Sequence, residues 1–174
     1  MTHTLIIALL FFILIKHRFF WKVPGRLRFN DPTPFLMAHR GYKKFNVENS
    51  IGSLIDAQQI GFQWIELDVV STKDKVVICS HNFDLERETI GKGYITDLRY
   101  NELKPIIAEH NKRNQGVNLL PKLIDVFKKL DSNIKINIEV KSPYAWDFKT
   151  ARALSKVLNK LPTDRIIISS FNPF

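Results

Sequence analysis

The sequence predicts an α/β fold with a mainly parallel sheet. Short apolar runs typical of buried strands alternate along the chain with amphipathic runs typical of helices. Polar residues gather where apolar runs end, as His39 and His81 do. Parallel strands joined by helices bring their carboxyl ends to one edge of a sheet, so these side chains are expected to meet there.

The composition fits one globular domain and argues against nucleic acid as a partner. The chain has 174 residues, of which 45% are hydrophobic and 25% charged, and its formal net charge is +9. Residues 1–30 hold five bases and no acid, so the rest of the chain carries only about +4. The single cysteine, Cys79, excludes an intrachain disulfide, and its apolar surroundings predict a buried core residue.

The pattern of apolar and basic residues over residues 1–23 predicts a membrane-anchoring helix. Thr4–Ile15 is an apolar run, and a basic and aromatic cluster typical of a membrane interface follows it. This run of 12 residues is shorter than the roughly 20 residues of a spanning helix. Thr2–Trp21 reaches that length if Lys16 and Arg18 extend toward the interface.

The positive-inside rule then predicts a single-pass membrane protein whose catalytic part lies in the cytoplasm. A buried helix that does not enter a membrane is the alternative. Residues 24–34 are expected to form a linker, and residues 35–174 are expected to form the functional domain.

The first half of this domain is predicted to contain three strands and one helix. The expected elements are a strand over Phe35–Ala38, a helix over Ile51–Ile60, a strand over Phe62–Val70 and a strand over Val76–Ser80. Ser50 can cap the helix, and Gly61 suits its end. The polar stretch from Phe83 to Tyr100 is expected to be an active-site loop.

The second half continues the alternation of helices and strands. A short helix beginning near Asp97 is expected to stop before Pro105, and Glu109–Asn118, with His110, is expected to be a loop. Further along, we expect a helix over Pro121–Leu130, a strand over Lys135–Val140, a helix over Ala151–Leu161 and a strand over Ile166–Ser170. Alternation in the first of these strands places Glu139 and Lys141 on one side.

Two acids on the second predicted strand indicate a metal site. Glu66 and Asp68 are two residues apart, so both carboxylates point to the same side. In an apolar run they repel each other, and a divalent cation is the simplest compensating charge. An exposed edge strand is the alternative, which the apolar neighbours disfavour. His39 and His81 follow apolar runs on either side of this pair, which favours acid–base chemistry over a structural role.

Several short motifs carry a resemblance to a known family. In chain order they are His39-Arg40-Gly41, Glu48-Asn49-Ser50, Glu66-Leu67-Asp68, Ser80-His81-Asn82, Glu139-Val140-Lys141 and Ser170-Phe171-Asn172-Pro173. Together they resemble the glycerophosphodiester phosphodiesterase family from Phe35 to the last residue. The resemblance implies a (β/α)₈ TIM barrel. Five strand patterns are present, so the expected fold is a barrel truncated after about five strands, plus an apolar N-terminal helix.

The resemblance also implies the roles of individual residues. Its catalytic pair corresponds to His39 and His81, and Arg40 and Lys141 are expected to bind the substrate phosphate. Glu48 and Asn82 are expected to support the groups that contact substrate. The implied metal ligands are Glu66, Asp68 and Glu139, three carboxylates that suit Mg²⁺ or Ca²⁺.

Some positions depart from the family pattern. Val47 stands where the family usually has proline, and Asn82 stands where an Asp is common. The segment Leu85-Glu86-Arg87-Glu88-Thr89 is a loose match to the usual Leu-Asp-Arg-Thr-Thr. None of the implied catalytic residues is lost.

The function implied is metal-dependent hydrolysis of glycerophosphodiesters to sn-glycerol 3-phosphate and an alcohol, in phospholipid metabolism. The alternatives are a lysophospholipase D-like or sphingomyelinase D-like enzyme on the same barrel, and an inactive phosphate-binding fragment. The expected partners are a glycerophosphodiester or lysophospholipid substrate, the membrane through the N-terminal helix and, in a homo-oligomer, further copies of the chain.

Overall fold

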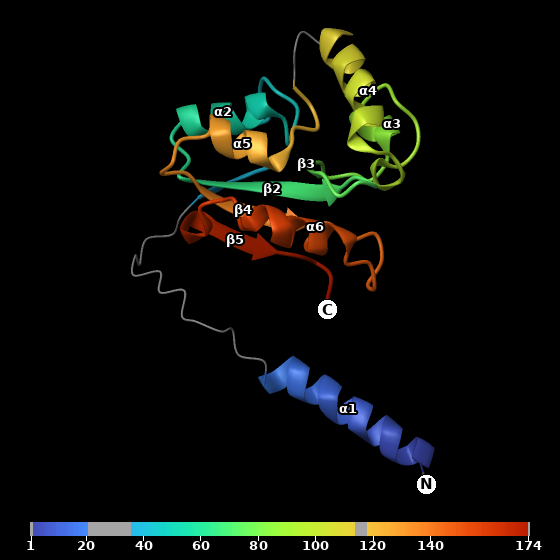
Figure 1. The fold of residues 1–174 in the computed structure, drawn as a ribbon. Helices are drawn as coiled ribbons and strands as arrows, with labels where there is room; N and C mark the ends of the chain where they lie inside the picture. Colours follow the sequence, from blue (N-terminus) through green and yellow to red (C-terminus); the bar gives the residue numbers. More distant parts are fainter. Residues whose placement is uncertain (1, 21–35, 114–117, 174) are drawn as a thin grey trace. The chain divides into compact units, whose positions relative to one another are not determined.

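The computed structural model describes residues 2–20, 36–113 and 118–173. Its contacts divide the chain into two units, residues 1–34 and 35–174. In the first unit the described residues form one helix, α1 (Thr2–Phe20) (Figure 1). The predicted linker over residues 24–34, the last part of the predicted anchor and Phe35 lie outside the described residues.

The predicted membrane anchor is contradicted by the structure. Among the residues that the structure describes, no helix combines the length and the apolar character needed to cross a bilayer. The last turns of α1 carry Lys16, His17 and Arg18, so its apolar run stays well below the roughly 20 residues that a span requires. The prediction of a single-pass membrane protein with a cytoplasmic catalytic part is therefore wrong.

The second unit contains a five-stranded, mainly parallel sheet, so the predicted α/β class is confirmed. Its strands are β1 (Met37–His39), β2 (Trp64–Ser71), β3 (Val77–Cys79), β4 (Lys135–Val140) and β5 (Ile166–Ser169). The order β1-β2-β4-β5 is parallel throughout. Strand β3 instead pairs antiparallel with β2. Residues 72–76 are too few for the crossover that a parallel pair needs, and they form a tight turn.

Three helices cover one face of this sheet. They are α2 (Ile51–Gln59), α5 (Leu123–Lys129) and α6 (Lys149–Leu158), and Figure 1 shows α2 and α5 together on one side of β2. The main core lies under them and takes Ile65, Leu67 and Val69 from β2. Helix α2 begins as predicted, because the Ser50 hydroxyl accepts a hydrogen bond of 3.1 Å from the Ser53 N–H.

Four shorter or peripheral elements complete the fold. They are α3 (Leu85–Glu88), the 3-10 helices η1 (Ile95–Asp97) and η2 (Thr163–Arg165), and α4 (Tyr100–Arg113). Helix α4 continues through Pro105 instead of stopping before it, because Leu103 and Ile107 pack into a second core cluster on either side of the proline. The predicted loop is thus wrong over residues 109–113, which are helical and include His110. Residues 114–117 lie outside the described part of the chain.

Candidate active site

The register of three parallel strands brings three carboxylates, from β2 and β4, together with His39 of β1. His39 of β1 lies opposite Glu66 of β2, and Asp68 of β2 lies opposite Glu139 of β4. Each of the three acids offers a carboxylate oxygen, and these oxygens all lie within 4.8 Å of one another. Glu66 and Asp68 are buried, and Glu139 is partly buried. Parallel pairing therefore gathers acids that are more than 70 residues apart in the sequence.

Two carboxylate oxygens of this cluster lack a hydrogen-bond donor in the part of the chain that the structure describes. Within the described residues, Glu66 Oε1 and Asp68 Oδ1 are buried and have no hydrogen-bond partner. Burial, together with the charges of Asp68 and Glu139, raises the pKa of Glu66 to about 7. A hard divalent cation binds carboxylate oxygens and removes this repulsion. The donor set therefore fits a divalent metal ion.

Arg40 connects the carboxylates to the loop that follows β1. Its Nε lies 3.0 Å from Asp68 Oδ2, and its Nη1 donates to Glu48 Oε1 at 2.8 Å. Its backbone N–H donates to Glu66 Oε2 at 2.9 Å. Burial alone would raise the pKa of Glu48, but the hydrogen bond from Arg40 and nearby cations lower it below the ordinary value. Glu48 is thus held as an anion that fixes the guanidinium.

The turn at Arg40 and Gly41 requires an unusual backbone. Arg40 has a φ of 59° and Gly41 a φ of 82°, both in the left-handed region. A Cβ atom on Gly41 would lie 2.6 Å from the carbonyl carbon and oxygen of Ser53 in α2. Glycine lets the turn approach α2 this closely, and the approach sets the direction of the Arg40 side chain.

Lys141 lies at the same edge of the sheet, directly after β4. Its Nζ lies 3.0 Å from Glu139 Oε1 and 3.6 Å from Asp68 Oδ1. The side chain is mostly buried, so its charge acts on the carboxylates with little screening by water. Lys141 and Arg40 therefore hold positive charge on two sides of Asp68.

Asn49 is a site residue that the sequence reasoning missed. Its amide donates to Asp68 Oδ2 at 3.0 Å, and its carbonyl oxygen accepts from the Asp68 N–H at 3.0 Å. Asn49 is buried and has a φ of 57°, a conformation that asparagine tolerates better than most residues. Its place between Glu48 and Ser50 in one motif was the available signal.

The two histidines reach the site by different routes. His39 ends β1, its Nε2 lies 3.8 Å from Glu66 Oε2, and 61% of its side chain is exposed. Burial and the charges of Arg40 and Lys43 lower the pKa of His39. His81 follows β3, which runs against β2, and the Ser80 N–H donates to the Asp68 carbonyl at 3.1 Å.

The expectation that His39 and His81 both follow parallel strands of the sheet is therefore wrong for His81. The tight turn after β2 reverses the chain and returns it to the level of Asp68. The next residue, Asn82, is held by a buried acid of α3. Its N–H and side-chain amide both donate to Glu88 Oε1, at 3.1 and 2.8 Å. Glu88, only 8% exposed, thus fixes the loop that carries His81.

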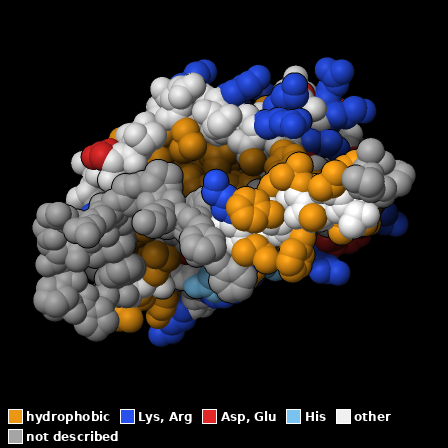
Figure 2. All heavy atoms as spheres, turned by 90° about the horizontal axis from the view of Figure 1, so that it is seen from below, with side chains coloured by type: hydrophobic (Ala, Val, Ile, Leu, Met, Phe, Trp, Pro, Cys, Tyr) orange, Lys and Arg blue, Asp and Glu red, His pale blue; other side chains and the backbone are white. Residues whose placement is uncertain are grey.

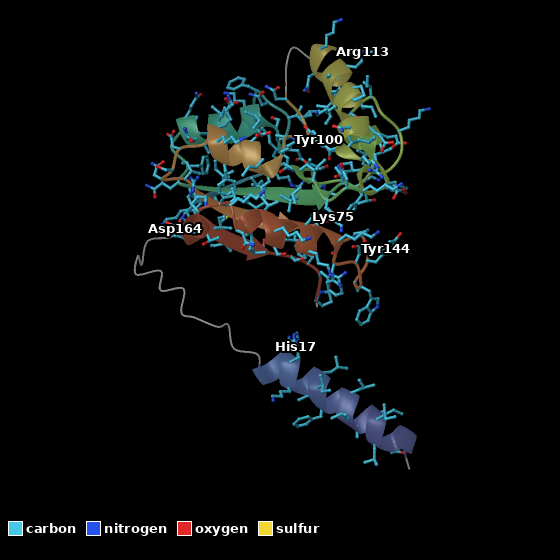
Figure 3. All side chains as sticks on the ribbon, in the orientation of Figure 1. His17, Lys75, Tyr100, Arg113, Tyr144 and Asp164 are labelled. Carbon is cyan, nitrogen blue, oxygen red and sulfur yellow. The ribbon has the colours of Figure 1, made fainter. Side chains whose placement is uncertain are left out.

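A hollow of about 300 Å³ opens beside Glu139 and Lys141. Phe171, Asn172 and Pro173 of the C-terminal motif line it together with the loop after β4. Tyr144 of that loop also lines the hollow and is labelled in Figure 3. The hollow offers space for a small molecule beside Glu139, the one carboxylate of the three that lines it.

Comparison with known proteins agrees with this geometry. The model of the glycerophosphoryl diester phosphodiesterase family matches residues 39–174. The chain belongs to this family. A glycerophosphodiester phosphodiesterase of Caldanaerobacter subterraneus is 33% identical over 143 residues, which cover 80% of this chain and 58% of that protein. The human lysophospholipase D GDPD1 is 35% identical over 130 residues, which cover 69% of this chain and 41% of that protein.

Solved structures of family members share the fold. A phosphodiesterase of Oleispira antarctica, in complex with the product sn-glycerol-3-phosphate, matches with a TM-score of 0.70 and 30% identity. The match covers 80% of this chain and 58% of that one. A glycerophosphodiester phosphodiesterase of Thermotoga maritima matches with a TM-score of 0.65 and 29% identity, over 80% of this chain and 55% of that one. The chain thus spans little more than half the length of these two proteins.

Proposed function

We propose that the protein hydrolyses glycerophosphodiesters to sn-glycerol 3-phosphate and an alcohol, with the help of a divalent metal ion. The three carboxylates within 4.8 Å of one another, flanked by Arg40 and Lys141, carry this proposal. Membership of the family and the product bound to the Oleispira antarctica relative support it.

Glu66, Asp68 and Glu139 would hold the metal ion, for which Mg²⁺ and Ca²⁺ are the proposed candidates. When bound, the metal supplies positive charge that polarises the phosphoryl group. Arg40 and Lys141 would bind the phosphate oxygens. Arg40 would do so through its guanidinium group, whose Nη1 and Nε already contact Glu48 and Asp68, and Lys141 as a point charge. Glu48 and Asn49 would position Arg40 and Asp68 by the hydrogen bonds described above.

His39 and His81 would divide the proton transfers between them. Hydrolysis forms a bond from an attacking oxygen to phosphorus and breaks the bond from phosphorus to the alcohol oxygen. One imidazole takes the proton of the attacking hydroxyl group, and the other gives a proton to the leaving alcohol. Asn82, tied to Glu88, would hold the His81 loop in place.

We propose further that residues 35–174 form part of an eight-stranded (β/α)₈ barrel. The parallel order β1-β2-β4-β5, with the carboxylates at one edge and helices over the opposite face, supports this arrangement. The fold similarity to the Oleispira antarctica and Thermotoga maritima proteins supports it as well.

Lysophospholipids are a second candidate substrate class, because the human relative is named a lysophospholipase D. Both classes carry a phosphodiester beside a glycerol group, so the same carboxylates and cations serve either. The acyl chain distinguishes the two classes, and we propose the hollow lined by Phe171 as the place on this chain that would contact it.

The test is release of sn-glycerol 3-phosphate from glycerophosphocholine by the purified chain, with Mg²⁺ or Ca²⁺ and with EDTA. Release of choline from lysophosphatidylcholine is measured in parallel. We expect metal-dependent release that falls by at least about 100-fold in His39→Ala, the loss typical of a general acid or base. His110→Ala, in α4, is the matched histidine control and should keep activity. A chain that unfolds cooperatively yet turns over neither substrate class contradicts the proposal.

A further inference from the structure

A second hollow, lined by bases, lies apart from the carboxylates. It measures about 460 Å³ and opens between the turn that joins β2 to β3, the 3-10 helix η1 and helix α6. Its nine lining residues are five bases and four residues with hydroxyl groups. The bases are Lys73, Lys75, Lys149, Arg152 and Lys156. Among the described residues that line it there is no Asp or Glu.

The basic hollow and the carboxylates lie on opposite faces of β2. Residues alternate along a strand, so Ser71, which lines the hollow, faces away from the side of Glu66 and Asp68. The Ser71 N–H donates to Thr150 Oγ1 of α6 at 3.2 Å and so fixes α6 against the strand. Lys75, labelled in Figure 3, comes from the turn after β2. The hollow shares no lining residue with the candidate active site.

Few acids offset these bases. Lys149 lies 3.8 Å from a carboxylate oxygen of Asp147, and the other four bases have no carboxylate within 4.0 Å in the described parts of the chain. Asp74, in the adjoining turn, accepts hydrogen bonds from the Thr72 hydroxyl and the Tyr100 N–H instead. Figure 2, which does not single out this hollow, shows more Lys and Arg than Asp and Glu side chains on the face it presents.

The five bases of this hollow equal in number the excess of bases over acids in the whole domain. Residues 35–174 hold 21 Lys and Arg against 16 Asp and Glu. The positive charges of bases that line one hollow repel one another, and a bound anion relieves this repulsion.

Helix α6 supplies three of the five bases, Lys149, Arg152 and Lys156. Its first turn has no acid and carries Lys149 and Arg152, where the helix dipole disfavours cations. The Asp147 carboxylate already accepts a hydrogen bond of 2.8 Å from the Lys149 N–H, so a further anion would contact the side chains of this turn and not its first N–H group. Lys149, Arg152 and Lys156 follow each other at helical spacing, over about 10 Å at 1.5 Å per residue. A single phosphate contacts only part of such a row.

We infer that this hollow binds a small anion that carries two or more phosphate groups. The inference goes beyond the proposed hydrolysis, because the hollow lies on the other face of the sheet and contains none of the groups placed in the reaction. The four hydroxyl residues can donate to phosphate oxygens that the bases leave free.

Calorimetric titration of the chain with inorganic tripolyphosphate, in EDTA, tests this inference. We expect Arg152→Ala/Lys156→Ala to weaken binding by about tenfold or more. Both side chains are exposed, so the double variant should fold. Lys75→Gly is the second variant, because Lys75 has a φ of 68° and glycine keeps that turn while removing the charge. Inorganic phosphate should bind at least about tenfold more weakly than tripolyphosphate.

Two control variants test whether cations outside this hollow account for the binding of tripolyphosphate. Lys112→Ala/Lys160→Ala removes two exposed bases elsewhere and should leave binding unchanged. Lys141→Ala weakens only tripolyphosphate that binds at the candidate active site, and should leave unchanged the binding that Arg152→Ala/Lys156→Ala removes. Equal weakening in either control, or unchanged affinity in Arg152→Ala/Lys156→Ala, overturns the inference. A failure of hydrolysis with this binding intact would overturn only the proposed function.

A sedimentation assay distinguishes a free anion from a lipid headgroup as the source of the phosphates. The probe is phosphatidylcholine vesicles that contain a small fraction of phosphatidylinositol bisphosphate. If the protein sediments with these vesicles and Arg152→Ala/Lys156→Ala does not, the lipid headgroup is the source of the phosphates. Tripolyphosphate binding without such sedimentation assigns a free anion.

Discussion

At the residue scale, Asn82 and Glu88 form a coupled pair beside His81. The family usually has Asp and Thr at these two positions. Here an amide and a carboxylate replace them, and the amide and its own N–H both donate to Glu88. The two departures therefore compensate each other, since an Asp at position 82 would face a buried carboxylate without a side-chain donor.

This pairing predicts that Asn82→Asp alone destabilises the protein by about 1–3 kcal/mol, because Glu88 loses its side-chain donor and faces a second carboxylate, while the backbone N–H of residue 82 still donates to it. Asn82→Asp/Glu88→Thr should recover most of that loss. Urea unfolding of the single and double variants measures the coupling. Asn101→Asp, at the exposed start of α4, is the matched control and should be nearly neutral. A double variant less stable than Asn82→Asp would contradict the coupling.

Residue patterns predicted the acids of the site better than the groups that support them. Glu66 and Asp68 were found from their spacing of two in an apolar strand, and Glu139 came from the resemblance. Asn49 and Glu88 were missed as supporting residues because their role depends on contacts across the fold. Each is buried against a group 6 to 19 residues away in the chain.

At the element scale, the approach of the Arg40 turn to α2 depends on Gly41. Gly41 and Gly61 both have φ in the left-handed region, at 82° and 99°. A Cβ on Gly41 would overlap the Ser53 backbone, whereas a Cβ on Gly61 meets nothing within 4 Å. Substituting each glycine in turn therefore separates two contributions to the free energy of unfolding. One is the cost of the left-handed backbone conformation, and the other is the cost of the close approach to α2.

We expect Gly61→Ala to cost about 1–2 kcal/mol through its backbone conformation alone. Gly41→Ala should cost about 1–3 kcal/mol more, because the methyl group overlaps α2. The free energies of unfolding in urea give both values. Equal losses at the two positions would show that the turn does not approach α2 as closely as described.

Hydrophobic periodicity predicted the positions of most helices and strands. The predictions failed where contacts with other parts of the fold determine the structure. Alternation gave β4 its correct bounds, and the Ser50 cap placed the start of α2. The direction of β3 was missed, although the five residues between β2 and β3 are too few for a crossover. Pro105 indicated a helix end, but burial of Leu103 and Ile107 holds α4 together across it. Tertiary packing overrides the local signal there.

At the scale of the whole molecule, the sheet is what creates the site. Residues from three strands and the loops after them converge only because β1, β2 and β4 run parallel in that order. The sequence predicted this convergence from polar residues at strand ends. It did not predict the N-terminal unit correctly, because an apolar run followed by bases has the composition of an anchor without the required length.

Thermal unfolding with Mg²⁺, Ca²⁺ or EDTA measures directly whether the three carboxylates bind a divalent metal ion. At a metal concentration 100 times the dissociation constant, the melting temperature should rise by roughly 5–10 °C. Asp68→Asn should abolish the rise, and Asp125→Asn, an exposed acid of α5, should keep it. No rise with either metal, or an equal rise in Asp68→Asn, would contradict the account.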